Sequence, residues 1–178
     1  HVGRDNFITG LQKYFAKHAF KNTTLDDLLN ELTATSGRDL KPWVDTWLRT
    51  SGVNTLRPKL EISGDTYSAI SVIQEAPTMP VGSTELRPHR MAVGLYDLSG
   101  STLKLRKSVE LDVAGALTEV KELAGEKVAD LLLLNDRDLS YGKIRFDDRS
   151  IATLKSHLGK LDDGLARALC WSAAWDML

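Results

Sequence analysis

The sequence predicts a mainly β protein: an antiparallel β-sandwich of about seven strands between a small N-terminal helical segment and a C-terminal helical segment. Apolar residues recur at helical spacing over roughly residues 4–51. Short alternating segments separated by turn sequences fill roughly residues 55–147, and a helical pattern returns from about Asp148. We therefore expect three regions: 1–54 (helical), 55–147 (sandwich) and 148–178 (helical).

The first region holds three predicted helices. The first one has apolar and aromatic residues at helical spacing, at Phe7, Leu11, Tyr14, Phe15 and His18. Thr24 and Asp27 resemble a capping box for the second helix, and Gly37 suits its C-terminal cap. Asp39 is expected to cap the third helix, with Pro42 in its first turn. One face of that third helix consists of Leu40, Trp43, Val44, Trp47 and Leu48, which are expected to pack on the preceding helices.

The clearest strand pattern lies at Thr102–Val113, where apolar and polar residues alternate. Lys107 is the one exception on the inward face, which is expected to hold Leu103, Leu105, Val109, Leu111 and Val113. The run Leu131–Leu134 is expected to be a central strand covered on both sides. The further predicted strands are Leu56–Ile62, Thr66–Gln74, Arg90–Asp97, Leu117–Leu123, Asp130–Leu134 and Tyr141–Phe146.

The last region predicts two helices. Ser150 can cap the first, and Asp162 with Asp163 places negative charge before the second. The second helix carries an apolar face without a C-cap signal, so we expect the chain to be a piece of a larger protein. This face is expected to have few partners and to form an exposed patch, open to self-association, at Leu165, Leu169, Trp171, Trp175 and Leu178.

Composition excludes several classes of partner and site. The net charge is −1, so we expect no nucleic-acid partner. No apolar run approaches the roughly 20 residues of a membrane span, so no membrane association is expected. Cys170 is the only cysteine, which excludes an internal disulfide and fits a reducing, cytoplasmic location.

Candidate catalytic and metal-binding motifs are scarce, and we expect no catalytic, cofactor-binding or metal residue in this chain. The histidines His1, His18, His89 and His157 lie far apart, and none begins an H-E-x-x-H motif. No G-x-S-x-G elbow and no Gly-rich phosphate loop occurs. Three Asp-Asp pairs precede or begin predicted helices and are better explained by capping, at 26–27, 147–148 and 162–163.

Leu86–Arg90 is the densest polar constellation. Its two arginines could grip a carboxylate or phosphate. The favoured interpretation is structural, with the arginines at a strand entry bridging to acidic neighbours. Trp43 with Trp47 and Trp171 with Trp175 are i, i+4 pairs on apolar helix faces, so they are expected to be packing residues.

An ordered series of short motifs occurs in the first part of the chain: Phe7, Gly10-Leu11, Tyr14-Phe15, Asn22-Thr23-Thr24, Asp27-Leu28, Ser36-Gly37, Trp43, Trp47 and Gly52. This series resembles the closing helices of the catalytic domain in the aminopeptidase N family of gluzincin zinc metallopeptidases. The remainder resembles the actinobacterial branch: Asn54–Pro58, Arg87–Arg90, Gly94–Asp97, Asn135–Leu139, Arg167–Trp171 and Ala174–Met177. Arg137 departs from the expected acidic pattern.

The resemblance implies a parent enzyme that removes N-terminal residues from peptides with a zinc ion. Its zinc ligands, substrate-anchoring loop and catalytic tyrosine all precede the matching segment, so no site residue carries over. The chain would then be a non-catalytic spacer and domain junction. Its partners would be the remaining domains and, through the parent, a peptide substrate.

Two other functions remain open. One is an independent β-sandwich module that binds a protein or carbohydrate, which predicts exposed aromatic residues at a loop end. The other is a hydrolase with an unrecognised site, which predicts a cleft with convergent histidines and carboxylates.

Overall fold

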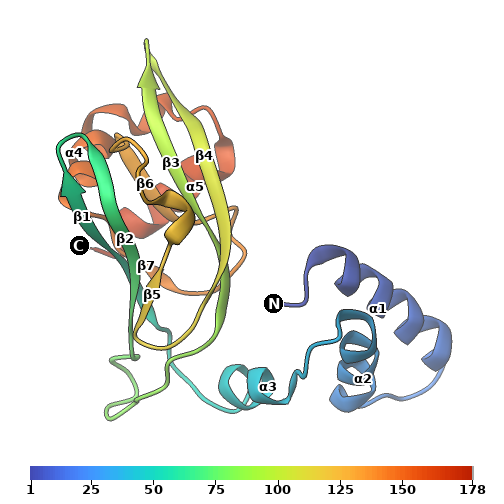
Figure 1. Ribbon diagram of the computed structural model, residues 1–178. Coiled ribbons are helices and arrows are strands. Elements are labelled where there is room, and N and C mark those ends of the chain that lie inside the picture. The colour runs from blue at the N-terminus through green and yellow to red at the C-terminus, as the bar shows by residue number, and fades with distance from the viewer. Residues whose placement is uncertain (178) are drawn as a thin grey trace. The chain divides into compact units, whose positions relative to one another are not determined.

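The computed structural model describes residues 1–177 and divides the chain into two compact units, His1–Thr50 and Ser51–Leu178 (Figure 1). The mainly β fold with helices at both ends is confirmed. The boundaries predicted at 54/55 and 147/148 remain predictions, and the two units are described separately below.

The first unit contains α1 (Arg4–His18), α2 (Leu25–Ser36) and α3 (Lys41–Trp47). The predicted capping box of α2 is present, because Thr24 and Asp27 exchange hydrogen bonds and Gly37 takes the left-handed conformation at the C-cap. Helices α1 and α2 approach closely at Gly10, where a Cβ would lie 2.8 Å from Leu32 Cδ2. On α3, Asp39 accepts a hydrogen bond from the Lys41 amide but stands one residue before the N-cap position.

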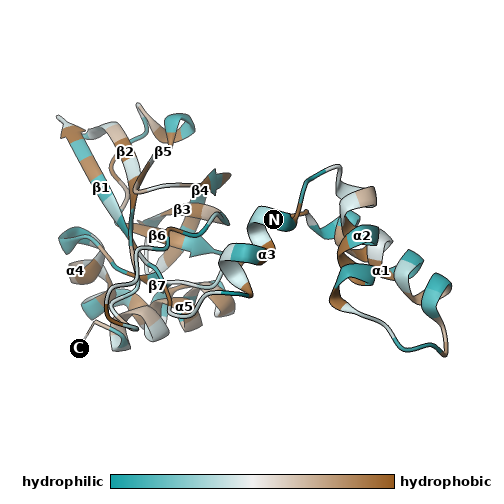
Figure 2. Ribbon diagram, turned by 90° about the horizontal axis from the view of Figure 1, so that it is seen from below, coloured by the Kyte–Doolittle hydropathy of each residue, from teal (hydrophilic) through white to brown (hydrophobic). Residues whose placement is uncertain are grey.

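The second unit is built on two sheets. One has the strand order β5-β2-β1-β7 and the other β4-β3-β6. The strands are β1 (Thr55–Ser63), β2 (Thr66–Glu75), β3 (His89–Ser99), β4 (Thr102–Val113), β5 (Leu117–Glu119), β6 (Leu131–Asp136) and β7 (Lys143–Ile144). Figure 2 shows three layers: the β1–β2–β5 region, the β3–β4–β6 sheet, and the helices α4 (Asp148–His157) and α5 (Gly164–Trp175).

Part of the inward face predicted for β4 is wrong because the strand contains a bulge. Leu95 pairs with Lys107 but the next residue, Tyr96, pairs with Leu105, so Arg106 is an extra residue. One extra residue moves every later side chain to the opposite face of the sheet. Leu103 and Leu105 therefore share the Tyr96 face, whereas Val109, Leu111 and Val113 share the Leu95 face with Lys107. Leu105, predicted to be buried, is 45% exposed.

Three other strand predictions need correction. The segment Leu117–Leu123 keeps only β5 as strand and then turns into a 3-10 helix, η1 (Lys121–Leu123). Of Tyr141–Phe146 only β7 is strand, and it pairs with β1 in parallel rather than antiparallel. Strand β6 is covered on both faces as predicted, but it is the edge of its sheet and β3 is central.

Helix α4 begins differently from the prediction. Asp147, not Ser150, is the N-cap, because its carboxylate accepts the Ser150 amide at 3.0 Å. Ser150 is buried, and its hydroxyl oxygen accepts the Leu132 amide at 2.9 Å. The first turn of α4 thereby covers the open edge of β6. For α5 the predicted capping is confirmed, since Asp163 accepts the Ala166 amide at 2.8 Å.

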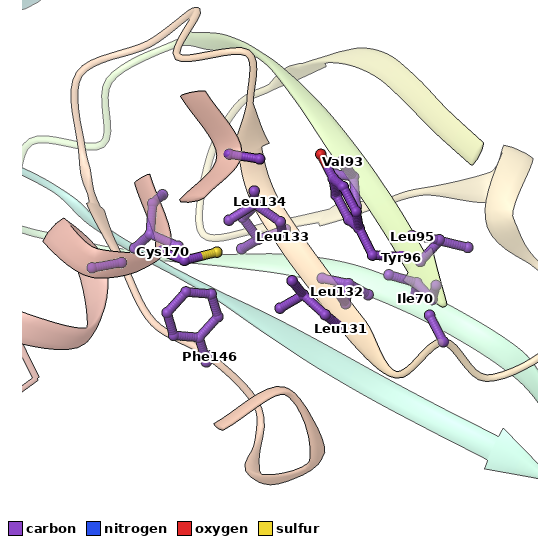
Figure 3. Packing of buried hydrophobic residues seen from close by; sticks show 14 of the residues in the cluster. Ile70, Val93, Leu95, Tyr96, Leu131, Leu132, Leu133, Leu134, Phe146 and Cys170 are labelled. Carbon is purple, nitrogen blue, oxygen red and sulfur yellow. The ribbon is translucent and has the colours of Figure 1, made fainter. Parts of the chain in front are cut away.

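The hydrophobic core joins all three layers. Figure 3 shows side chains of β6 between Cys170 of α5 and Ile70 of β2. Helix α5 enters this core through small residues, Ala166, Cys170 and Ala173. Backbone pairing supports the packing, because the Asp162 amide donates to Leu103 O beside the outer edge of β4. The helices after residue 147 are therefore part of the same compact unit as the sheets.

Candidate functional site

The predicted polar constellation at Leu86–Arg90 contributes to a buried network, here called the Arg87 cluster, which consists of Asn54, Gln74, Arg87, His89 and Ser140. Arg87 is 2% exposed. Its guanidinium donates to Asn54 Oδ1 at 3.0 Å and to Ser51 O at 2.9 Å. Asn54 in turn donates to the backbone oxygens of Glu75 and Glu85. The cluster thus fastens the start of β1 to the segment that leads into β3.

His89 is the histidine at the first position of β3 and is 1% exposed. Gln74 donates through Nε2 to Gly115 O, so its Oε1 faces His89 Nε2 at 3.1 Å and accepts a hydrogen bond from the N–H at that position. His89 Nδ1 is then the acceptor for the Ser140 hydroxyl at 2.7 Å. Burial, followed by the charge of Arg87, lowers the pKa of His89 to about 4. The imidazole is therefore neutral at pH 7 and uses both nitrogens inside the protein.

The two arginines of this segment differ. Arg90 lies 3.3 Å from Glu110 and 3.6 Å from Asp112 on the neighbouring strand β4, as the structural interpretation predicted. Arg87 donates to the Asn54 side-chain oxygen and to the Ser51 backbone oxygen. Both guanidinium groups bond to other groups of the chain. No feature of the described residues therefore supports the alternative in which they bind a carboxylate or phosphate.

The remaining histidines lie apart. His1 stacks on Trp43, and His18 contacts Tyr14. His157 is in the last turn of α4. Among residues 1–177, no group of three or more His, Cys, Asp or Glu side chains could hold a metal ion. The Asp pairs act at helix starts, through Asp27, Asp147 and Asp163.

The Cys170 thiol is buried against the sheet. Burial, with a smaller contribution from the Asp136 charge, raises its pKa to about 12. The thiol is therefore protonated at neutral pH and is a packing group rather than a nucleophile.

The outward side of α5 carries large apolar side chains. Trp171 is 60% and Trp175 is 71% exposed, so this pair does not pack inside the described chain and belongs to the exposed patch expected on this helix. Leu165 is also exposed, which agrees with the predicted patch, whereas Leu169 is partly buried. Leu178, the last residue of the predicted patch, lies outside the described residues.

An apolar groove runs beside Trp171, and we call it the α4–α5 groove. Its volume is about 660 Å³. It lies between α5 and the segment formed by α4 and the following 3-10 helix η2 (Leu158–Lys160). Its lining consists of Phe146, Ile151, Leu154, Lys155, Ser156, Leu158, Gly159, Trp171, Ala174 and Met177. The sequence reasoning missed this groove, although Ile151, Leu154 and Leu158 recur at helical spacing and signalled one wall.

In comparison with known proteins, the chain is similar to segments of longer proteins. It is 50% identical over 182 residues to aminopeptidase N of Streptomyces lividans, which covers 99% of this chain and 21% of that protein. It is 43% identical over 51 residues to aminopeptidase N of Lactococcus lactis, covering 29% of this chain and 6% of that protein. The chain therefore spans about a fifth of the length of the Streptomyces relative. No family model matches the chain.

A solved structure supports the fold. A crystal structure of Legionella pneumophila aminopeptidase A matches with a TM-score of 0.64 over 94% of this chain and 18% of that chain, at 18% identity. At this identity the likeness concerns the fold alone. In the described part of the chain, residues 1–177, none of the helices has the length and apolar character that crossing a bilayer would take.

Proposed function

Since this chain matches aminopeptidase N over 99% of its length and represents a segment of that family, we propose that it is a non-catalytic spacer and domain junction of a zinc aminopeptidase. The parent would remove N-terminal residues from peptides. The observation that carries this proposal is the 50% identity, which extends across both helical segments and the sandwich. In this reading 1–54 closes a catalytic domain, 55–147 is the spacer, and 148–178 begins a helical domain.

The zinc ion that the family implies does not fit the residues of this chain. Both nitrogens of His89 are already bonded to Gln74 and Ser140, and His1, His18 and His157 lie on separate helices or at the chain start. Zinc sites need several ligands that converge on one point. In the proposal the metal and its ligands therefore belong to the rest of the parent, as does the peptide substrate. A cytoplasmic location is part of the same proposal and is supported by the single, buried cysteine.

A chimera tests this function. The matching segment of the Streptomyces lividans aminopeptidase N is replaced by this chain, and hydrolysis of an aminoacyl amide is measured. The chimera should retain activity within about tenfold of its parent, because the identity is high and no catalytic group changes. The chain alone should be inactive and should hold no stoichiometric zinc after dialysis. Hydrolysis by the chain alone, or an inactive but folded chimera, would contradict the proposal.

The alternative, an independent binding module, predicts exposed aromatic residues at a loop end. Tyr141, 71% exposed in the loop before β7, is an observation in its favour. A glycan array and a peptide array probed with the chain would support this alternative if binding were lost on Tyr141→Ala and unchanged on Trp175→Ala.

A further inference from the structure

The α4–α5 groove is an apolar surface whose two walls come from different segments. Phe146, Ile151 and Leu154 lie on the α4 side, and Trp171, Ala174 and Met177 lie on the α5 side. The volume of about 660 Å³ lies within the range of concave binding sites in proteins.

We propose that the α4–α5 groove binds an amphipathic helix whose apolar face is flanked by acidic side chains. The proposal rests on the proposed function only for the source of this helix, which would be the rest of the parent polypeptide. The groove's shape and charge stand independently of that source.

The shape of the groove favours a helix. Helix-in-groove recognition uses large apolar anchors at i, i+3, i+4 and i+7 against an apolar trough. Here Trp171 is a large exposed anchor beside two small residues, Ala174 and Gly159, which leave space for an incoming side chain. A small-molecule pocket needs buried polar groups that fix orientation. The buried lining residues, Phe146 and Leu154, are apolar, while Lys155 and Ser156 are exposed.

The charge of the groove favours an acidic partner. Lys155 lines the groove, and Lys160 is an exposed residue that follows the lining residue Gly159 in η2. Neither lysine takes part in an ion pair within residues 1–177. No Asp or Glu lines the groove in this part of the chain. Charge complementarity of this kind selects the partner and its orientation more than it adds affinity.

A second copy of the chain is disfavoured by the same charges. A two-fold interface places the same patch on both sides. Lys155 of both copies would then lie along one contact, and like charges repel. The occupant is therefore a different segment with negative flanks.

A designed peptide provides the probe. It is a labelled helix of about 18 residues, or five turns, with Leu at i, i+3, i+4 and i+7 and Glu on both flanks. The matched control has Lys in place of Glu, and a second control has the Glu peptide scrambled. Fluorescence polarisation at low salt should show the Glu peptide binding at least about tenfold more tightly than the Lys peptide. The difference should shrink as salt rises.

Two variants of α5 locate the contact. Trp171→Ala should weaken binding of the Glu peptide by about tenfold or more, as expected for a buried aromatic anchor. Trp175→Ala removes a tryptophan that is more exposed but does not line the groove, so affinity should stay within about twofold. The double variant Lys155→Glu with Lys160→Glu should reverse the preference toward the Lys peptide. Circular dichroism of each variant checks that the fold is retained.

Several outcomes would overturn the proposal. The first is equal affinity for the three peptides, and the second is an equal loss of affinity in the two tryptophan variants. The third is a dimer of the chain that Trp171→Ala dissociates but that the Glu peptide leaves intact. The chimera assay keeps the two proposals apart. Peptide binding with an inactive chimera refutes the proposed function alone, and an active chimera without peptide binding refutes the groove assignment alone.

Discussion

Strand β6 and helix α5 are both rich in apolar residues, but β6 is buried and much of α5 is exposed. All six residues of β6 are buried, including four consecutive leucines. Helix α5 buries three small residues and exposes both of its tryptophans. The difference arises because β6 is covered on both faces, by the second sheet and by the helices, whereas only one side of α5 meets the sheet. Apolar content thus indicates that a segment needs cover without indicating what provides it.

The largest test of this contrast is Leu95→Ala in the central strand β3. Leu95 is fully buried, so the substitution should reduce the free energy of unfolding by about 2–5 kcal/mol. Leu105→Ala is the matched control on β4, and it should cost less than about 1 kcal/mol because half of the side chain is already in solvent. Urea unfolding measures both. Similar costs would show that the bulge at Arg106 does not divide the strand as described.

The second test is the pH dependence of the Arg87 cluster. Burial lowers the pKa of His89 to about 4, whereas an unfolded histidine titrates near 6.5. Between these values the unfolded state binds a proton that the native state does not. The contribution of neutral His89 to the free energy of unfolding is therefore fully present above pH 6.5. It decreases by about 3 kcal/mol as the pH falls from 6.5 toward 4.

His89→Gln is the control for that titration. It should flatten the slope of unfolding free energy against pH between 6.5 and 4. The hydrogen bond from Lys107 holds the pKa of Glu126 below its ordinary value of 4.5, so the loss from this carboxylate begins only at the acid end of this range. An unchanged slope in His89→Gln would mean that His89 is not the group responsible.

The third test concerns the face of β3 that meets Asp136. A Cβ at Gly94 would lie 2.8 Å from both Asp136 Oδ2 and Tyr96 Cε2, and Tyr96 donates to Asp136 at 2.7 Å. Gly94→Ala should cost about 1–3 kcal/mol through this overlap. Gly159→Ala in η2 meets nothing within 4 Å and should change stability by less than about 1 kcal/mol. Equal thermal shifts for the two variants would contradict this packing.

The smallest expected effect is on the outward side of α5. Trp175→Ala should change the unfolding free energy of the isolated chain by no more than about 0.5 kcal/mol, since 71% of the side chain is exposed. Chemical denaturation of the two proteins side by side measures the difference. A cost near that of Leu95→Ala would mean that Trp175 has a partner in solution.

The sequence predicted the positions of helices and strands better than it predicted which face of each strand is buried. Alternation located β4 correctly, but no local signal separates Arg106 from its neighbours as an extra residue, because bulges depend on the pairing partner. The parallel pairing of β7 with β1 likewise depends on a contact between distant segments. By contrast, the Thr24–Asp27 capping box and the Asp163 cap are local and were predicted correctly.

The candidate site was predicted in outline only. The Leu86–Arg90 segment was identified from charge density, yet charge favoured acidic partners for both arginines. The bonds from Arg87 to the Asn54 amide oxygen and the Ser51 backbone oxygen could not be predicted, because these groups become its neighbours only when β1 and β3 come together. The exposed patch on α5 was expected from its tryptophans, but the groove beside it needs the second wall from α4.

Hydrogen exchange tests the central claim most directly, namely that α5 and its groove are made to be covered by another part of a longer polypeptide. Amide protection is compared for α5 (Gly164–Trp175) and β3 (His89–Ser99), in the isolated monomeric chain and in the Streptomyces chimera. We expect α5 to exchange at least about tenfold faster than β3 in the isolated chain, and to slow toward β3 in the chimera. Equal protection of α5 in both proteins would contradict the account.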